Sequence, residues 1–497
     1  MKSVFVYLFA KYISYKNGFW KRNPVLAQEK TLKKLISQAK NTEFGKDHGF
    51  EKISSHKQWV KNVPIRDYEG IKKYIDRVVA GEHNVLWPKK PIYFCKTSGT
   101  TSGSKYIPIS KESMPYHIKS ARDAIFEYVL ESGDTSILSG KMIFLQGSPV
   151  LSKTSGVLTG RLSGIVAHHI PFYLKKNRLP SYKTNCIEDW EKKVDAIVSE
   201  TVDQNMTLIS GIPPWVKMYF EKINKKRGVS IGEVFPGFKL FIYGGVNYAP
   251  YKRSFEKLIG RKIGSVELYP ASEGFIAYQD SQKEKGLLLC VDNGIFYEFI
   301  LLSDFIKNKY ERIGLGRVVK GVDYVIILNT NAGLWGYNIG DTVRFVCLDP
   351  FRVVVSGRVG HFTSAFGEHV IAQEVEGSLE KAAESHFCSV LEFHVSPQIN
   401  PNSGLPFHEW LIEFDEEPND MSIFAETLDL NLQNKNTYYK DLIEGGVLRG
   451  LKIVVLKKGV FNHYMLSEGR LGGQNKPPRL ANNRKVAEKI IKINEKQ

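Results

Sequence analysis

The chain has 497 residues, which at about 150 residues per domain predicts roughly three folding units. Hydrophobic residues make up 42% and charged residues 24%, which excludes general disorder and collagen-like or low-complexity chains. Lys and Arg outnumber Asp and Glu by 69 to 52, a net charge of +17. This excess leaves nucleic acid, an anionic membrane or small anionic substrates open as partners.

The cysteines and the N-terminal segment bear on the cellular compartment. The five cysteines are odd in number and include no CxxC pair, so neither a zinc ribbon nor a disulfide framework is predicted. The apolar run from Val4 to Ala10 is interrupted by Lys11, and no small-residue cleavage site follows it. We therefore expect a first helix on the protein surface, no membrane span and a cytoplasmic location in a reducing compartment.

The order of apolar and helical patterns predicts a mixed α/β fold. After about 90 helical residues, strand-like runs alternate with helices such as Glu112–Leu130. From about residue 286 to 358 the strands are closely spaced, which favours antiparallel or barrel-like β structure. A helical pattern with its own later strands then begins. We predict a large N-terminal domain over residues 1–357 and a small α+β domain over residues 358–497.

The sharpest local signal is the run Thr97-Ser98-Gly99-Thr100-Thr101-Ser102-Gly103-Ser104-Lys105. Hydroxyls can hydrogen-bond phosphate oxygens, glycines let backbone N–H groups approach closely, and lysine adds positive charge. The run is not a Walker A loop, because Tyr106 follows Lys105 where that motif requires Ser or Thr. The pattern favours a phosphate loop over the other interpretation, a surface turn rich in Ser and Thr.

Two further motifs place a carboxylate beside a strand-like run. In Tyr269-Pro270-Ala271-Ser272-Glu273-Gly274, the acid suits Mg²⁺, which prefers one or two carboxylates plus phosphate oxygens, and the tyrosine suits base stacking. In Gly336-Tyr337-Asn338-Ile339-Gly340-Asp341, the carboxylate can accept hydrogen bonds from ribose hydroxyls. Taken alone, a solvated Glu273 and an ordinary Asx turn are the simpler interpretations.

The last two motifs are basic. Ser356-Gly357-Arg358-Val359-Gly360 combines small residues that suit a hinge with an arginine that suits a phosphate or a ribose. A surface loop is the alternative. The run GGQNKPPR places Lys476 on a glycine-flanked loop that can reach a site built elsewhere, or forms part of a solvated basic tail.

These five motifs occur in the order typical of the adenylate-forming enzymes, the superfamily of acyl-CoA synthetases, peptide-synthetase adenylation domains and luciferases. Segments along nearly the whole chain, among them AKNTEFGKDHGF, ELYPASEGFIAYQD and FGEHVIAQEVE, resemble the auxin-responsive acyl acid amido synthetases, and especially their bacterial relatives. The resemblance implies a ligase that uses ATP and Mg²⁺. A carboxylic acid would be converted to acyl-AMP and pyrophosphate, and an amine, expected to be an amino acid, would then displace AMP.

The resemblance also implies which residues bind ATP. Hydroxyls of the phosphate loop would hold the phosphates, Tyr269 would stack on adenine, and Asp341 would hold the ribose. The implied nucleotide-binding residues are Thr97, Ser98, Gly99, Thr100, Thr101, Gly244, Gly245, Tyr269, Ser272, Asp341 and Arg358.

For the metal, Glu273 with Thr100 is implied. Lys105 would lie beside the phosphates, and Lys476 would neutralise charge during adenylation. After Arg358 the sequence VGHFTSAFGEHV lacks the lysine that follows the hinge of plant members, which leaves the choice of catalytic lysine open.

The acyl acid is expected to bind near Gln146, Trp215 and Val246. The large apolar ring of Trp215 suits an acid with an apolar body, and equally suits core packing.

In the phosphate loop, Thr97 stands where the plant enzymes usually carry Ser, and the hydroxyl is kept.

Other functions fit parts of the sequence. An acyl-CoA ligase on the same scaffold would use a thiol acceptor. A nucleic-acid-binding protein would explain the charge, but no RNP, KH, zinc-finger or helix-turn-helix pattern occurs. A nucleotide-binding protein without catalysis is a further possibility, against which the intact Glu273 and Asp341 argue.

The basic excess itself favours a small anionic partner. Residues 433–497 hold 14 Lys and Arg against 5 Asp and Glu, which suits a domain that closes over ATP. We expect small-molecule acid and amine substrates, no nucleic acid, and a monomer.

Overall fold

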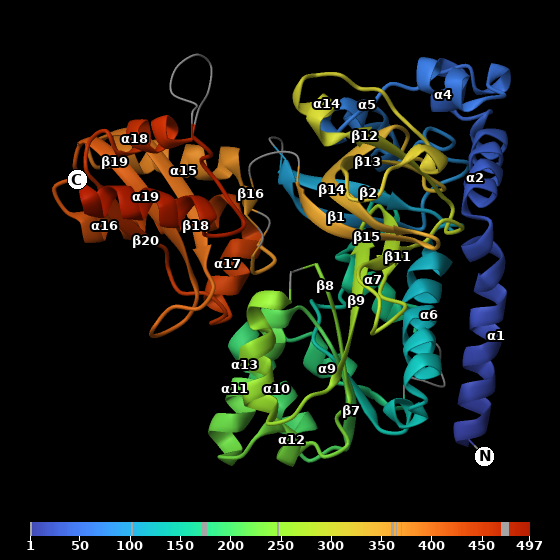
Figure 1. The fold of residues 1–497 in the computed structure, drawn as a ribbon, viewed down its shortest axis with the longest axis horizontal. Helices are drawn as coiled ribbons and strands as arrows, with labels where there is room; N and C mark the ends of the chain where they lie inside the picture. The colour runs from blue at the N-terminus through green and yellow to red at the C-terminus, as the bar shows by residue number, and fades with distance from the viewer. Residues whose placement is uncertain are drawn as a thin grey trace.

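The computed structural model describes residues 2–100, 103–170, 176–245, 248–358, 362–363, 365–368, 370–468 and 477–497. Over these residues the chain is a mixed α/β protein, as the sequence predicts. An 11-stranded sheet runs through the larger part of the molecule. A three-stranded sheet with its own helices forms the C-terminal part, coloured orange to red in Figure 1.

The strands of the large sheet are, in order across it, β12 (Ile295–Leu301), β13 (Asp323–Thr330), β14 (Tyr337–Leu348), β15 (Phe351–Arg358), β11 (Leu287–Leu289), β10 (Gly274–Tyr278), β9 (Gly264–Ala271), β8 (Leu240–Gly244), β7 (Met206–Ser210), β3 (Lys141–Phe144) and β6 (Arg178–Leu179). From β6 to β9 the neighbouring strands are parallel. From β9 to β12 they are antiparallel. The sheet therefore has a parallel half and an antiparallel half, which meet at β9.

Helices cover both faces of the parallel half. They are α6 (Met114–Ser132) on one face, and α10 (Trp190–Thr201), α11 (Pro213–Arg227), α12 (Ile231–Val234) and α13 (Ala249–Ile259) on the other. Along β8, Leu240 and Ile242 join the core under α6, whereas Phe241 and Tyr243 join the core under α11 and α13. Both sets are buried because alternate side chains point to opposite faces of a strand. This explains why the run LFIY is apolar throughout.

The closely spaced strands between residues 286 and 358 form the antiparallel half. The antiparallel interpretation of this segment is confirmed. Its barrel-like alternative is corrected, since β11 to β15 continue an open sheet that joins β9 through β10. A closed barrel would need the outer edge of β11 to pair with β12, but that edge pairs with β10.

A four-stranded sheet and the N-terminal helices form a separate layer. Its strands run in the order β2 (Gly103–Ile109), β1 (Tyr93–Thr100), β5 (Val157–Gly160) and β4 (Ser152–Thr154). The helices of this part are α1 (Lys2–Arg22), α2 (Pro24–Ala39), α3 (Glu43–Asp47), α4 (His56–Asn62), α5 (Tyr68–Val79) and α7 (Leu162–His168). The sheet and several of these helices share an aromatic core that includes Trp59 and Trp335, both fully buried.

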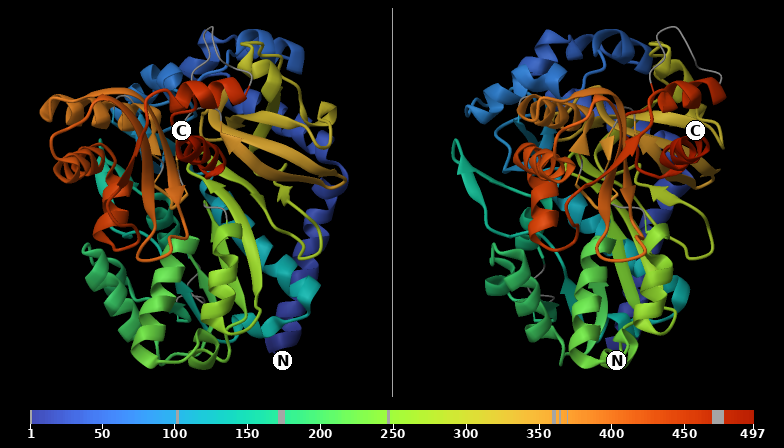
Figure 2. Two further views of the ribbon diagram at one scale, coloured as in Figure 1. Left: turned by 60° about the vertical axis from the view of Figure 1, so that its left-hand side comes forward. Right: turned by 90° about the vertical axis from the view of Figure 1, so that its left-hand side faces the viewer.

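The C-terminal part has the sheet order β18 (Ser389–Gln398), β19 (Phe407–Glu416) and β20 (Lys452–Leu456). Its helices are α15 (Ala372–Ser385), α16 (Met421–Lys435), α17 (Thr437–Glu444), α18 (Val460–Ser467) and α19 (Lys485–Lys496). The short pair β16 (Phe362–Thr363) and β17 (Val370–Ile371) precedes it. Figure 2 shows this part lying against the larger one, and Tyr251 on α13 donates a hydrogen bond to the carbonyl of Ala365 at 3.1 Å.

Short helical segments complete the fold: α9 (Tyr182–Asn185), α14 (Leu302–Ile306) and the 3-10 turns Phe50–Lys52, Thr135–Leu138 and Leu315–Arg317. No helix in the described part of the chain is both long and apolar enough to cross a bilayer. The domain boundary between residues 357 and 358 stays a prediction.

A buried carboxylate fastens α4 to the antiparallel half. Glu298 on β12 is fully buried and accepts hydrogen bonds from Arg312 at 3.1 Å, Asn329 at 2.9 Å and Trp59 at 3.3 Å, while His56 lies at 2.9 Å. Burial opposes ionisation of Glu298, but the His56 hydrogen bond and the Arg312 charge outweigh it and hold its pKa below the usual value. The ion pair is therefore formed inside the protein.

Replacing Glu298 with Gln should destabilise the protein by about 3–5 kcal/mol, because Arg312 is then left buried without its counter-charge. Urea unfolding at neutral pH measures this loss. The pKa of Glu298 is lowered in the folded state, so its contribution is present above the unfolded pKa and disappears as pH falls through the folded value. The difference between variant and wild type should therefore shrink in acid. As a control, Glu311→Gln removes the exposed pair with Arg317 and should cost less than about 1 kcal/mol.

Candidate active site

The carboxyl ends of β3, β7, β8 and β9 lie at one edge of the large sheet, because these strands are parallel. Ligands of open α/β sheets bind outside this edge. Gly244 ends β8 beside Leu268 of β9, and a Cβ on Gly244 would lie 2.4 Å from the Leu268 carbonyl oxygen. Gly245 follows with φ of +76° and open space on its Cβ side. The glycine pair thus exposes bare backbone at this edge.

The second of the five motifs, residues 269–274, forms the tight turn between β9 and β10. Ala271 pairs with Gly274, so Ser272 and Glu273 lie at the tip. The Ser272 hydroxyl accepts a hydrogen bond from the Cys95 thiol at 3.0 Å, although the two residues are 177 positions apart. This contact brings the turn against β1, the strand that leads into the phosphate loop.

Cys95 reports on the surroundings of this turn. Burial, helped by the nearby negative charge of Glu273, raises the pKa of the Cys95 thiol to about 12. The thiol is therefore protonated at neutral pH, which fits a donor to Ser272 and not a nucleophile. Glu273 itself is half-buried.

The third motif meets the second through a direct hydrogen bond. Tyr269 donates its hydroxyl proton to Asp341 at 2.6 Å, and Asp341 is 6% exposed on β14. The motif does contain the Asx turn that was the alternative interpretation, but Asn338 makes it: the Asn338 side-chain oxygen accepts from the Gly340 backbone N–H at 2.9 Å. Asp341 is thus a buried carboxylate that binds the motif tyrosine.

The fourth motif lies on the next strand. Arg358, the last residue of β15, is in direct register with Asp341 of β14. The backbone of the hinge motif and the ribose-type carboxylate are therefore neighbours. The structure describes the backbone of Arg358 and not its side chain.

The phosphate-loop run is a β-hairpin, with Thr97 of β1 paired with Lys105 of β2. The Lys105 ammonium lies 5.5 Å from the centre of the Tyr68 ring, and Tyr68 accepts a hydrogen bond from the Tyr106 backbone at 2.9 Å. The base of the hairpin is therefore held against α5. The backbone of Ser98, Gly99 and Thr100 continues β1.

Several predicted residues fall outside the described part of the chain. They are Thr101, Val246 and Lys476, together with the side chains of Ser98, Thr100 and Arg358. Their roles stay predictions. Among the described residues, no three His, Cys, Asp or Glu side chains form a group that could hold a metal ion. A single carboxylate beside a hydroxyl-rich hairpin is nevertheless a donor set that suits Mg²⁺ when phosphate oxygens complete the shell.

Two of the predicted acyl-site residues, Gln146 and Trp215, lie at the same sheet edge. Gln146 follows β3, and its buried amide nitrogen has no hydrogen-bond partner among the described residues. Trp215 lies in the first turn of α11, half-buried against the core of the parallel half. A buried amide without a partner is costly, so a substrate oxygen would satisfy it.

Arg161 belongs to this region and was missed by the sequence reasoning. A Cβ on Gly147 would lie 3.3 Å from the Arg161 side chain, so the arginine lies directly under the segment that follows β3. Its guanidinium forms an ion pair with Asp441 of α17 at 2.5 Å and lies 4.6 Å from the centre of the Tyr438 ring. No local motif marks Arg161, because its partners are some 280 positions away.

A buried lysine was missed as well. Lys193 on α10 is 2% exposed and donates to the Asn185 carbonyl at 2.7 Å. Burial, helped by the charge of Arg161, lowers the pKa of Lys193 to about 8.

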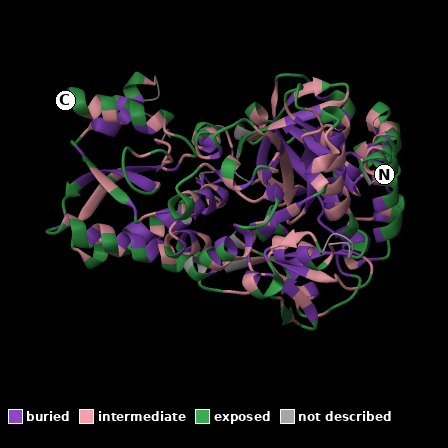
Figure 3. Cartoon of the chain, turned by 90° about the horizontal axis from the view of Figure 1, so that it is seen from below, coloured by how far each residue is buried: buried purple, intermediate pink, exposed green. Residues whose placement is uncertain are grey.

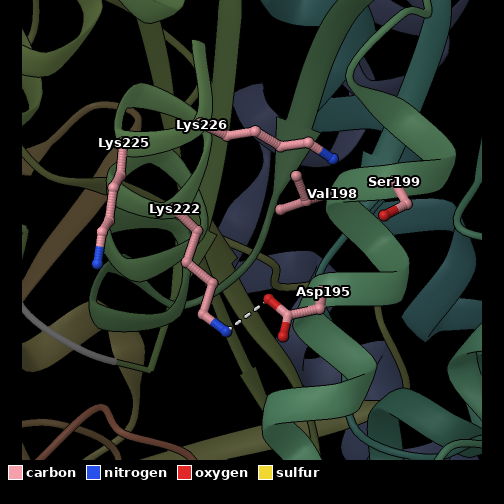
Figure 4. Close-up of a pocket in the computed structure, with 6 residues that line it drawn as sticks. All are labelled: Asp195, Val198, Ser199, Lys222, Lys225 and Lys226. Carbon is pink, nitrogen blue, oxygen red and sulfur yellow. Dashed lines mark hydrogen bonds and ion pairs between the residues drawn. The ribbon is translucent and has the colours of Figure 1, made fainter. Parts of the chain in front are cut away.

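A separate basic pocket lies between α10 and α11 (Figure 4). Lys222 forms an ion pair with Asp195 there at 2.7 Å. The lining residues are Asp195, Val198, Ser199, Lys222, Lys225 and Lys226. None of the residues predicted for ATP or acid binding lines it, so it is not part of the candidate site.

Models of one protein family match three stretches of the chain. The GH3 family N-terminal domain matches residues 19–183, the GH3 family central domain matches residues 288–358, and the GH3 family C-terminal domain matches residues 365–485. Together the three stretches cover most of the sequence.

Curated relatives have the same family character. The chain is 22% identical to the jasmonoyl–L-amino acid synthetase JAR4 of Nicotiana attenuata, over 64% of this chain and 66% of that protein. It is 20% identical to the indole-3-acetic acid-amido synthetase GH3.3 of Arabidopsis thaliana, over 92% of this chain and 89% of that protein.

Solved structures share the fold. The GH3.15 acyl acid amido synthetase superposes with a TM-score of 0.60 at 17% identity, covering 98% of this chain and 96% of its own. A 2-hydroxyisobutyryl-CoA ligase in complex with 2-HIB-AMP and CoA superposes with a TM-score of 0.59 at 12% identity, covering 96% and 93%.

Cys95 should resist alkylation in the folded protein, because its thiol is buried and its pKa is raised to about 12. Iodoacetamide treatment at about pH 8, followed by peptide mass mapping, measures this, since only a thiolate reacts quickly. The partly exposed Cys347 serves as the internal reference. Cys95 should become labelled once the protein is unfolded. Equal labelling of both thiols in the native protein would contradict the packing of the turn against β1.

Proposed function

The chain belongs to the GH3 family, and we propose that it is an ATP-dependent acyl acid amido synthetase. It adenylates a carboxylic acid and then transfers the acyl group to an amine, an amino acid. The observation that carries the proposal is the convergence of distant motifs: Asp341 binds Tyr269, Ser272 binds Cys95 at the base of the phosphate hairpin, and the backbone of Arg358 lies opposite Asp341.

ATP is proposed to bind along the carboxyl edge of β8 and β9. The bare backbone of Gly244 and Gly245 lets the adenosine approach closely, and the ring of Tyr269 stacks on the base. The Asp341 carboxylate accepts hydrogen bonds from the ribose hydroxyls. The phosphates lie along the hairpin. They are near Lys105 and near the hydroxyls of the run from Thr97 to Thr101.

Magnesium is proposed at Glu273, with Thr100 as a second ligand. When bound, Mg²⁺ supplies positive charge to the phosphate oxygens. The chain's own contribution is placement, since Gly274 with φ of +158° closes the turn that presents Glu273. A Cβ on Gly274 would lie 2.5 Å from the end of the Ile295 side chain, so a larger residue would force Ile295 to move.

The reaction needs positioning and charge neutralisation more than a protein nucleophile. In the first step a substrate carboxylate oxygen bonds to the α-phosphorus, and the bond to pyrophosphate breaks. In the second step the amine nitrogen bonds to the acyl carbon, and the bond to AMP breaks. Lys105 and Lys476 are proposed to neutralise the charge of the first step. The protonated Cys95 has no covalent part in it.

The acyl acid is proposed to bind beside Gln146, Trp215 and Val246. The Gln146 amide can donate to a substrate oxygen, and the Trp215 ring can pack against an apolar body. Arg161 holds α17 against this segment through Asp441. We place the domain boundary between residues 357 and 358 and expect residues 358–497 to rotate between the two half-reactions.

The enzyme is proposed to act on small molecules in the cytoplasm as a monomer. The five cysteines are all free, which fits a reducing compartment. An acyl-CoA ligase activity is the second candidate, because the fold is shared with a solved acyl-CoA ligase.

Acid-dependent exchange between pyrophosphate and ATP tests the first step. Replacing Glu273 with Gln should lower the exchange rate by about 100-fold or more, because a charged ligand of the phosphate region is lost. Asp341→Asn should raise the ATP concentration needed for exchange. The control is Glu284→Gln, an exposed acid on a neighbouring loop, which should leave exchange unchanged. Circular dichroism checks that each variant is folded. Full exchange in Glu273→Gln would remove its proposed role.

The acceptor separates the two candidate functions. With an acid that supports exchange, a mixture of amino acids should yield an amide conjugate detectable by mass spectrometry, and coenzyme A should yield no thioester. Thioester formation without amide would overturn the amido synthetase proposal in favour of the ligase. Absence of exchange with every acid in a broad panel, together with no ATP binding, would overturn both.

A further inference from the structure

Helix α1 is fixed to the body of the protein by one of its faces. Ala10, Ile13 and Trp20 on this face are buried, and the helix lies along α6. Asn17 donates to Asp123 of α6 at 3.0 Å, and Lys21 forms an ion pair with Glu127 of α6 at 2.6 Å. The helix is thus a firmly attached element, which Figure 1 shows along the outer edge of the molecule.

The opposite face of α1 is apolar and exposed. Its residues recur at intervals of three and four, which places them within an arc of about 80° at 3.6 residues per turn. Their exposed fractions are Phe5 71%, Leu8 55%, Tyr12 55%, Tyr15 80% and Phe19 55%. Val25 and Leu26 at the start of α2 are exposed as well, at 40% and 43%. Green, exposed residues mark this edge in Figure 3.

This outer face of α1 requires an explanation because of its size and order. Single exposed apolar side chains are normal on protein surfaces, whereas a contiguous aromatic stripe marks an interaction site. A surface position for this helix, as expected from its sequence, does not by itself explain five large apolar residues on its solvent side.

The charged residues of α1 indicate what kind of partner this face binds. The helix contains Lys2, Lys11, Lys16, Lys21 and Arg22 and no Asp or Glu. Lys11 and Lys16 are exposed and flank the apolar stripe on its two sides. From α2, the ammonium of Lys30 lies 5.4 Å from the ring of Phe19, and the exposed Glu29 is the acid nearest in sequence.

We propose that the outer face of α1 docks on an anionic lipid surface. Aromatic rings lie favourably at the headgroup level, lysines beside them reach the phosphates, and basic flanks are attracted to anionic lipid. A second copy of the chain fits less well, because pairing two such helices would bring their positive charges together. The helix lies in the surface and does not cross it, since its five basic residues and low hydropathy exclude a span.

Flotation of the full-length protein with vesicles tests the proposal. The vesicles are phosphatidylcholine alone, or phosphatidylcholine mixed with phosphatidylglycerol, at low and at high salt. The protein should float with the mixed vesicles at low salt, bind phosphatidylcholine weakly, and be released by high salt. The proposal is overturned if the protein does not float with the mixed vesicles at low salt, or if it floats equally well with and without phosphatidylglycerol.

The apolar contribution is tested by a triple variant, Phe5→Ser, Tyr12→Ser and Tyr15→Ser, which should abolish flotation. The matched control changes three exposed apolar residues elsewhere, Phe387→Ser, Ile423→Ser and Leu430→Ser, and should float like the wild type. Both variants should keep wild-type exchange of pyrophosphate with ATP, so a failure here is separate from a failure of the proposed function. Equal flotation of the triple variant and the wild type overturns the proposal.

The charge contribution is tested by Lys11→Gln with Lys16→Gln. At roughly 1 kcal/mol per basic residue, the partition coefficient on mixed vesicles should fall by about tenfold to thirtyfold. The control Lys225→Gln with Lys226→Gln removes two exposed lysines from the basic pocket and should change it little. Sedimentation equilibrium tests whether a second copy of the chain binds this face instead. If the wild type is a dimer and the triple serine variant is a monomer, the face is a dimer interface and lipid docking is overturned.

Discussion

The hydrogen bond between Tyr269 and Asp341 joins the two halves of the large sheet where the candidate site lies. Tyr269 is on β9, the last parallel strand, and Asp341 is on β14, in the antiparallel half. At 2.6 Å, with Asp341 buried, the contact fixes how the motifs of the two halves face each other. The β9–β10 turn and the register of Asp341 with Arg358 both depend on this arrangement. The same contact therefore belongs both to the sheet and to the candidate site.

Much of this site could be predicted because its residues lie in compact runs. The phosphate hairpin, the Ser272–Glu273 turn and the Asp341 strand each combine small or polar residues with an adjoining apolar strand. Local chemistry alone did not decide among interpretations, however. Asn338, three positions before Asp341, makes the Asx turn, and only the tertiary fold shows which carboxamide or carboxylate turns inward.

Contacts between distant segments account for what the sequence could not predict. The open sheet depends on the pairing of β11 with β15, which no turn signal encodes. In the sequence, Glu298 is an ordinary acid within an apolar strand. In the structure, four side chains surround it: two from α4, one from β13 and that of Arg312. Arg161 and Asp441 are likewise unremarkable until the C-terminal part folds beside the segment after β3. Side chains with distant partners leave no periodic pattern in a single sequence.

A buried carboxylate also holds the start of the C-terminal part in place. Glu368 and His408 are both fully buried and lie 2.9 Å apart, and Glu368 also accepts from the Phe366 backbone at 2.8 Å. Burial opposes ionisation of Glu368, but His408 outweighs it and keeps the pKa of Glu368 low. A fixed carboxylate at this point anchors the segment that follows the hinge motif.

The net charge of +17 has more than one location and therefore more than one cause. The 14 basic residues among positions 433–497 suit a domain that closes over an anionic nucleotide. Those of α1 cannot serve that purpose, because α1 runs along the outer edge of the molecule, beside α6 and away from the C-terminal part (Figure 1). The three lysines of the pocket between α10 and α11 form a third group, also away from the site motifs. Composition alone treats these groups as one excess. Their positions separate an attraction for the substrate from an attraction for a surface.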